Sequence, residues 1–142
     1  MIPGFPARIG IDFGTTNSSV ALARDGAVQL LQFGSPEGSS ASSRSLLYLQ
    51  RRMQAAGKPV SAWTGAAGIQ HYLATDTFDD AIQGRLIQSL KSHLSARNLT
   101  GTEIFGRQYQ FEDLLARILR DLRLRASEFF GFEVTQALSG RP

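Results

Sequence analysis

One short stretch of the chain carries the residue types that bind phosphate. Residues 9–23 read IGIDFGTTNSSVALA: an apolar-alternating segment that ends in an acid, a Gly-Thr-Thr-Asn corner, and a second apolar segment. Because side chains alternate along a strand, Ile11 and Phe13 fall on one face and Asp12 on the other. The stretch therefore predicts a β-hairpin with a ligand-binding corner.

The corner combines a flexible backbone with several hydrogen-bond donors. Gly14 can adopt a positive φ and allows close approach of a ligand to the backbone. The amides of Gly14, Thr15 and Thr16 can converge as an anion-binding nest, to which the two hydroxyls add neutral donors. Asp12 would repel a phosphate, so its presence indicates a Mg²⁺ ion between the two groups. Asn17 is expected to shape the corner, because asparagine side chains bond neighbouring backbone groups.

A simpler interpretation of the same residues remains open. Gly-Thr-Thr-Asn is also compatible with an ordinary hairpin turn, and Asp12 with a solvated strand end. The full run is more specific than a bare Asp-x-Gly-Thr, because apolar alternation precedes it and a second strand follows at once.

The run IGIDFGTTNSSVAL closely resembles the first phosphate motif of the 70-kDa heat-shock (DnaK-like) chaperones, within the actin, hexokinase and chaperone ATPase superfamily. Weaker similarity to the family extends over RLIQSLKSHL at 85–94 and FGFEVTQALSGRP near the end. The runs SRSLLYL, AGIQHYL and RLIQSLKSHL are most similar to its divergent YegD-like branch. The resemblance implies ATP or ADP with Mg²⁺ as cofactors. It places Thr15 and Thr16 at the β- and γ-phosphates, gives Gly14 the role of making room, and assigns Asp12 to the hydrated Mg²⁺.

The remaining pattern predicts an α/β fold. We expect strands at 8–13, 18–23, 27–32, 46–50, 60–65 and 134–138, with a tight turn at 24–26 between the second and third. We also expect helices at 66–74, 78–94 and 111–130, a hairpin at 102–109 turning at Gly106, and a mobile Ser/Gly loop at 34–45. By resemblance this is a partial ribonuclease-H-like lobe. Residues 1–39 and 111–142 would form the lobe, 40–110 an inserted α+β subdomain, and strand 134–138 would lie beside 8–13.

Composition excludes several classes of function. The net charge is +3, and the arginines are interleaved with acids, so we expect no nucleic-acid partner. The chain has no cysteine, which rules out disulfides and thiolate metal sites. It has neither a membrane-length apolar run nor a basic-then-apolar signal at its start, so we expect a cytoplasmic protein without a membrane partner.

Few other side chains suggest chemistry. His71 and His93 stand on separate predicted helices without clustered ligands, and Trp63 and Tyr72 are expected to be packing residues. The arginines of the last helix, Arg117, Arg120, Arg123 and Arg125, are expected on its outer face. No catalytic residue is assigned.

Three functions remain open. The first is the N-terminal ATP-binding fragment of a heat-shock-70-like chaperone, whose full-length form would hydrolyse ATP and bind unfolded client proteins and co-chaperones. The family's γ-phosphate lysine is missing from the matching stretch at 65–70, and only Arg85 or Lys91 could replace it, so binding is better supported than turnover. The others are a small-molecule kinase of the same superfamily and a non-catalytic structural or interaction module.

The resemblance also predicts how the chain associates. The family has further strands and helices after the point that matches Pro142, so we expect a fragment in which the edge of strand 134–138 is unpaired. Open edges and apolar faces drive self-association. We therefore expect a homo-oligomer.

Overall fold

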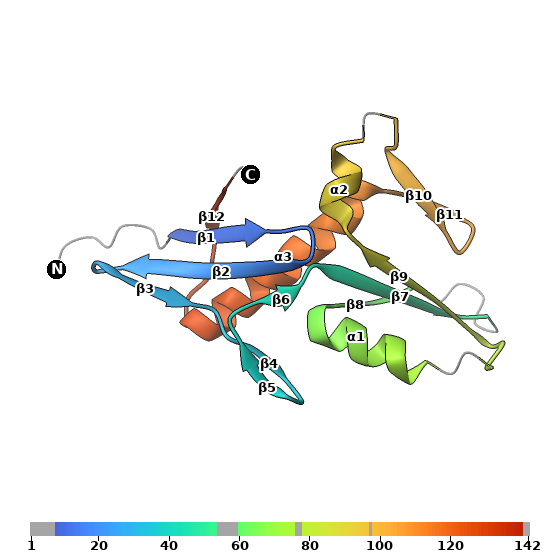
Figure 1. Cartoon of the computed structure of the whole chain (residues 1–142), viewed down its shortest axis with the longest axis horizontal. Coiled ribbons are helices and arrows are strands. Elements are labelled where there is room, and N and C mark those ends of the chain that lie inside the picture. The colour runs from blue at the N-terminus through green and yellow to red at the C-terminus, as the bar shows by residue number, and fades with distance from the viewer. Residues whose placement is uncertain (1–7, 54–59, 76–77, 97, 141–142) are drawn as a thin grey trace.

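The computed structural model describes residues 8–53, 60–75, 78–96 and 98–140 of the chain. Residues 1–7 and 141–142, at the outer limits of the two expected lobe segments, lie outside the described residues. The fold is mixed α/β and consists mostly of strands, with three helices among the described residues. Figure 1 shows the longest helix, α3 (Phe111–Phe130), crossing behind the first sheet.

The first sheet is built around the predicted hairpin. β1 (Arg8–Phe13) pairs antiparallel with β2 (Asn17–Arg24), which pairs antiparallel with β3 (Ala27–Leu30). β12 (Gln136–Ser139) lies parallel to β1 on its other side, with Ile9 opposite Ala137. The predicted neighbourhood of these two strands is therefore confirmed.

The turn between β2 and β3 has the geometry of a two-residue hairpin. Asp25 and Gly26 both have positive φ, 52° and 77°. Type I′ turns require this at both central residues, and their twist matches that of the flanking strands. The tight turn expected at this point is confirmed.

The predicted mobile loop at 34–45 is wrong in part, because most of it forms strands. β4 (Phe33–Ser35) and β5 (Gly38–Ser40) make a small hairpin, and β6 (Ser43–Arg44) pairs with the start of β2. Apart from Phe33, the β4–β5 hairpin is exposed. Hydrophobic periodicity arises when one face of a strand is buried, so a strand exposed on both faces leaves no such signal in the sequence.

A second sheet has the order β8-β7-β9. Its central strand, β7 (Leu46–Arg52), is buried from Leu46 to Leu49 because α1 (Gly65–Ala74) covers one face and the common core lies on the other. β8 (Ser61–Thr64) leads directly into α1, whose Gly68 packs against Leu46. The predicted short helix at 66–74 is confirmed.

The predicted helix at 78–94 is wrong. Most of the segment is β9 (Ile82–Gln88), antiparallel to β7, and only α2 (Leu90–Leu94) is helical. A repeat of four is even, so it also places residues on one face of a strand, and the pattern alone does not separate the two structures. Within the strand, Gly84 packs against Tyr48 of β7, and a Cβ there would collide with the tyrosine hydroxyl.

The last part of the chain follows the prediction closely. β10 (Gly101–Ile104) and β11 (Arg107–Gln110) form the expected hairpin, with positive φ at Phe105 and Gly106. α3 then runs from Phe111 to Phe130 and ends at Gly131, whose left-handed φ of 77° lets its amide donate to the Ser127 carbonyl at 3.0 Å.

One hydrophobic core joins the two sheets. The buried face of α3 packs between side chains of both sheets, and the core includes Ile9, Val20, Leu22, Leu47, Leu49, Ile87, Leu114, Ile118, Leu122, Ala126 and Val134. Within the described residues no helix is both long and apolar enough to cross a bilayer.

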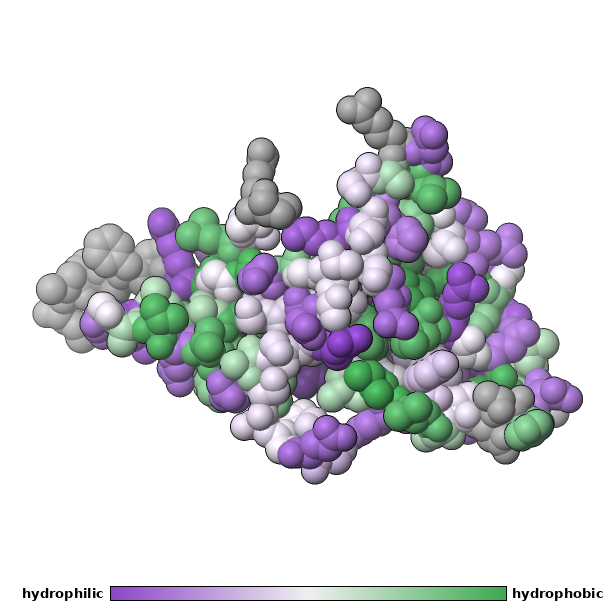
Figure 2. All heavy atoms as spheres, viewed as in Figure 1, coloured by the Kyte–Doolittle hydropathy of each residue, from purple (hydrophilic) through white to green (hydrophobic). Residues whose placement is uncertain are grey.

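The sheet face beside α3 is not fully covered. An apolar groove of about 340 Å³ runs between α3 and the strands β1 and β12, and is lined by Ile11, Phe13, Leu115 and Leu119 among others. Within the described residues β12 pairs only with β1, so its outer edge is open. Apolar side chains also reach the surface over α1 and near β3 (Figure 2).

We predict that the chain self-associates through β12. Leu138 is 67% exposed on this strand, and a lysine on an open edge opposes pairing with a second strand. Leu138→Lys should therefore lower the apparent mass in light scattering. Leu73→Lys, at a 74% exposed position of α1, is the control. A monomeric parent protein at tens of micromolar would contradict the prediction.

Candidate functional site

The corner between β1 and β2 is closed by its own backbone. The two strands remain paired as far as Phe13 and Ser18. The amide of Gly14 then donates to the carbonyl oxygen of Asn17 at 3.0 Å. Asn17 thus shapes the corner through its main-chain oxygen.

Glycine is required at position 14 for a different reason from the one expected. The φ of Gly14 lies outside the left-handed region, so the predicted role of a positive φ is wrong. Instead, a Cβ at this position would collide with the carbonyl oxygen of Asn17. Gly10, within β1, has nothing within 4 Å of the place a Cβ would occupy.

The free donors of the corner belong to the two threonines. Thr15 and Thr16 are exposed, and neither their amides nor their hydroxyls bond to any described residue. The Gly14 amide is already engaged, so the corner offers two free amides rather than the expected three. Two amides and two hydroxyls on adjacent residues fit an anion such as a phosphate.

Asp12 stands one position before the end of β1, opposite Ser19. Its side chain is exposed and makes no hydrogen bond or ion pair with a described residue. Among the described residues there is no group of three or more His, Cys, Asp and Glu side chains that could hold a metal. A Mg²⁺ ion at Asp12 would therefore need phosphate oxygens and water as its other ligands, which this ion accepts readily.

The junction between β6 and β7 holds the corner in place through Ser45. The Ser45 amide donates to the carbonyl oxygen of Thr16 at 2.8 Å, and the hydroxyls of Ser45 and Ser18 are 2.7 Å apart. Ser18 and Ser45 are 2% and 3% exposed. A hydrogen bond between two buried hydroxyls is strongly position-specific, because either group alone would be left unsatisfied.

These serines are the residues that sequence reasoning missed. Ser45 lies in the run GSPEGSSASSRS, whose composition is typical of a loop, and nothing in that run distinguishes it from its neighbours. The only available signal was the step from this run into the apolar segment LLYL, which marks where the second sheet begins.

The stretch 65–70, where the resemblance predicts a lysine, begins beside β6. Gly65 begins α1 with a φ of 56°, and a Cβ there would collide with the hydroxyl of Ser43 on β6. β6 in turn pairs with Asn17 and Ser18. The stretch without the expected lysine therefore packs close to the base of the corner.

The other candidate side chains take structural positions. Arg85 is exposed on β9, opposite Leu49, and Lys91 is on α2. His71 stacks on Trp63 with ring centroids 3.8 Å apart, and His93 stacks on Phe111 at 5.1 Å. Tyr72 packs edge-on against Tyr48. These contacts are those of packing residues.

No protein-family model matches the chain.

We predict that Gly14→Ala destabilises the protein and Gly10→Ala does not. The collision with the Asn17 carbonyl oxygen must be relieved by opening the corner, at a cost of about 2 kcal/mol in the free energy of unfolding. Gly10→Ala should change that free energy by less than about 0.5 kcal/mol. Urea unfolding followed by circular dichroism measures both. Equal effects of the two substitutions would show that the corner is not closed as described.

Proposed function

We propose that this chain is part of the nucleotide-binding lobe of a chaperone similar to the 70-kDa heat-shock family, and that the β1–β2 corner binds the phosphates of Mg-ATP or Mg-ADP. One observation carries the proposal. Two adjacent threonines with free amides and hydroxyls follow an unpaired carboxylate, on a corner held by buried contacts.

The arrangement of elements supports the ribonuclease-H-like part of the proposal. The strand order β3-β2-β1-β12, with β12 parallel to β1 and preceded by α3, is the order expected from the resemblance. The second sheet, α1 and the β10–β11 hairpin lie between β6 and α3 in the chain. This position supports 40–110 as an inserted subdomain.

The site favours binding over hydrolysis. The stretch 65–70 has no lysine to stabilise charge on a transferring phosphoryl group. Arg125 lines a pocket with Ala66, Ala67 and Gln70, but its guanidinium already bonds to Asp121. For the fragment itself, this also favours the alternative of a non-catalytic interaction module.

For the complete protein we propose the wider activity that the resemblance implies. It would couple ATP binding and hydrolysis to the binding of unfolded client proteins, assisted by co-chaperones, in the cytoplasm. No feature of the described residues favours the small-molecule kinase.

We predict weak, Mg²⁺-dependent binding of ADP at the corner. The affinity of one phosphate corner should be about millimolar, near −4 kcal/mol. In an amide-shift titration with Mg-ADP, the largest changes should fall on residues 14–17. Asp12→Asn should remove the Mg²⁺ dependence with little loss of stability, because the side chain is exposed and unpaired.

Asp25→Asn is the matched control, since Asp25 is also an exposed acid beside a hairpin corner of the same sheet. It should leave the titration unchanged. Shifts that spare residues 14–17, or an equal effect of the two substitutions, would reject the site.

We also predict that this chain does not turn over ATP. Phosphoryl transfer needs charge stabilisation and a positioned water, and the corner supplies only neutral donors and one carboxylate. A coupled assay of phosphate release should remain at the buffer rate. Steady release that disappears in Thr15→Ala would contradict this prediction.

A further inference from the structure

A second concave site lies beside α3, away from the β1–β2 corner. It is an open pocket of about 250 Å³ between α3 and the β8–α1 junction. Its lining includes three arginines of α3, which are Arg117, Arg120 and Arg125. It also includes an apolar wall formed by Ala62, Trp63 and Leu124. The expectation that these arginines merely face solvent does not account for their convergence on a pocket.

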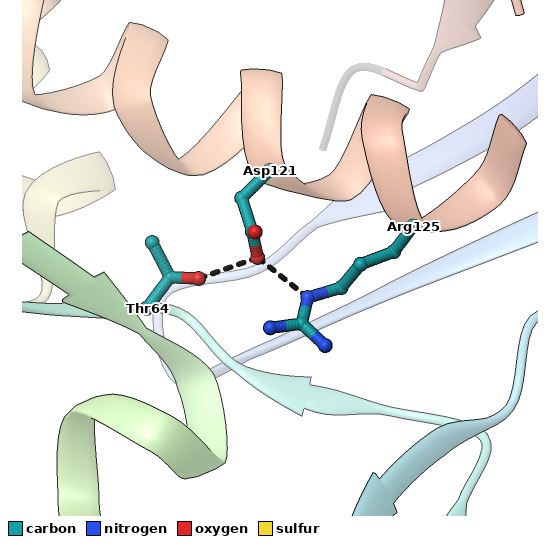
Figure 3. A network of polar contacts seen from close by, with 3 residues as sticks. All are labelled: Thr64, Asp121 and Arg125. Carbon is teal, nitrogen blue, oxygen red and sulfur yellow. Dashed lines mark hydrogen bonds and ion pairs between the residues drawn. The ribbon is translucent and has the colours of Figure 1, made fainter. Parts of the chain in front are cut away.

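The charge of this pocket is not balanced. Asp121 is the one acid in its lining, and its carboxylate accepts from the Thr64 hydroxyl and from the Arg125 Nε, the latter at 2.7 Å. Figure 3 shows Asp121 between these two partners. Arg117 and Arg120 make no hydrogen bond or ion pair with any described residue. The lining therefore carries an excess of two positive charges.

Trp63 also lines the pocket, and its ring is held in place on the α1 face of the second sheet, where it pairs with Tyr48. Trp63 stacks on His71 at 3.8 Å with an interplanar angle of 16°, and on Tyr48 at 6.1 Å and 23°. Tyr48 is fully buried, and its hydroxyl bonds to that of Thr75 at 2.6 Å. A rigid indole presents apolar area at little cost in conformational entropy.

We infer that this pocket binds a small phosphate monoester with an aromatic or apolar body. Guanidinium groups match phosphate oxygens in a fork geometry, and two unpaired arginines match the dianion. The apolar wall accommodates the body, and the volume limits the ligand to a small molecule. Because the arginines supply the positive charge, this site needs no Mg²⁺, unlike the corner proposed above.

Phenyl phosphate is a suitable probe, and Trp63 is a built-in reporter because it is the only tryptophan in the sequence. With EDTA present, the full chain should show a saturable change in tryptophan fluorescence. Phenyl phosphate should bind about tenfold more tightly than inorganic phosphate, because its ring buries apolar area. Phenol should give no saturable change. Benzoate binding as tightly as phenyl phosphate would overturn the assignment to a phosphate.

Variants locate the site. Arg117→Gln with Arg120→Gln should weaken phenyl phosphate binding tenfold or more, because it removes charged hydrogen-bond donors. Arg123→Gln is the matched control for Arg120→Gln alone: each removes one charge from the same helix, but Arg123 lines the groove beside β1. This control should change the affinity less than about twofold. Equal losses of affinity in Arg120→Gln and Arg123→Gln would show that the effect depends only on net charge, and would overturn the proposal.

Two further variants keep the test decisive. Arg120→Gln alone changes an exposed side chain, so it should retain the parent's thermal midpoint and still weaken binding severalfold. Thr15→Ala should leave phenyl phosphate binding in EDTA unchanged. A loss in Thr15→Ala would place the phosphate at the corner and reject the arginine pocket, whereas failure of ADP to shift residues 14–17 would reject only the corner.

Discussion

A buried hydrogen bond between two hydroxyls holds the corner hairpin against the start of the second sheet. Ser18 belongs to the hairpin that carries the corner, and Ser45 immediately precedes the central strand of the second sheet. Their hydrogen bond, and that from the Ser45 amide to Thr16, fix the point where the chain passes from one sheet to the other. Since a buried hydroxyl without a partner is costly, this contact favours the observed register between β6 and β2.

Helix α3 packs against both sheets, so the two sheets share one hydrophobic core. Its buried residues Leu114, Ile118 and Leu122 repeat at helical spacing and contact strands of both sheets. The same helix presents Arg117 and Arg120 toward α1 and Arg123 toward the groove beside β1. One helix thus supports the core and also supplies charge to two different surfaces.

The two proposed anion sites rest on different physics. The corner offers neutral donors beside a carboxylate, so it depends on a cation that the ligand must bring. The pocket on α3 carries its own positive charge on arginines, and Asp121 compensates only Arg125. Binding at the corner should therefore depend on Mg²⁺, and binding at the pocket on salt.

The sequence by itself determined the local elements whose signals are short-range. The Asp25–Gly26 and Phe105–Gly106 turns, the strands around the corner and the long helix ending at Gly131 follow from turn chemistry, alternation and capping. These signals depend only on neighbours in the chain.

Only the tertiary structure decided the features that depend on distant partners. The segment 82–88 is a strand because it pairs along β7, where Tyr48 packs over Gly84. Ser45 acquires a role because the fold buries it against Ser18, and the arginines of α3 form a pocket because β8 and α1 close it. The physical reason is common to these three: burial and pairing between residues far apart in the chain leave no periodic trace in either segment alone.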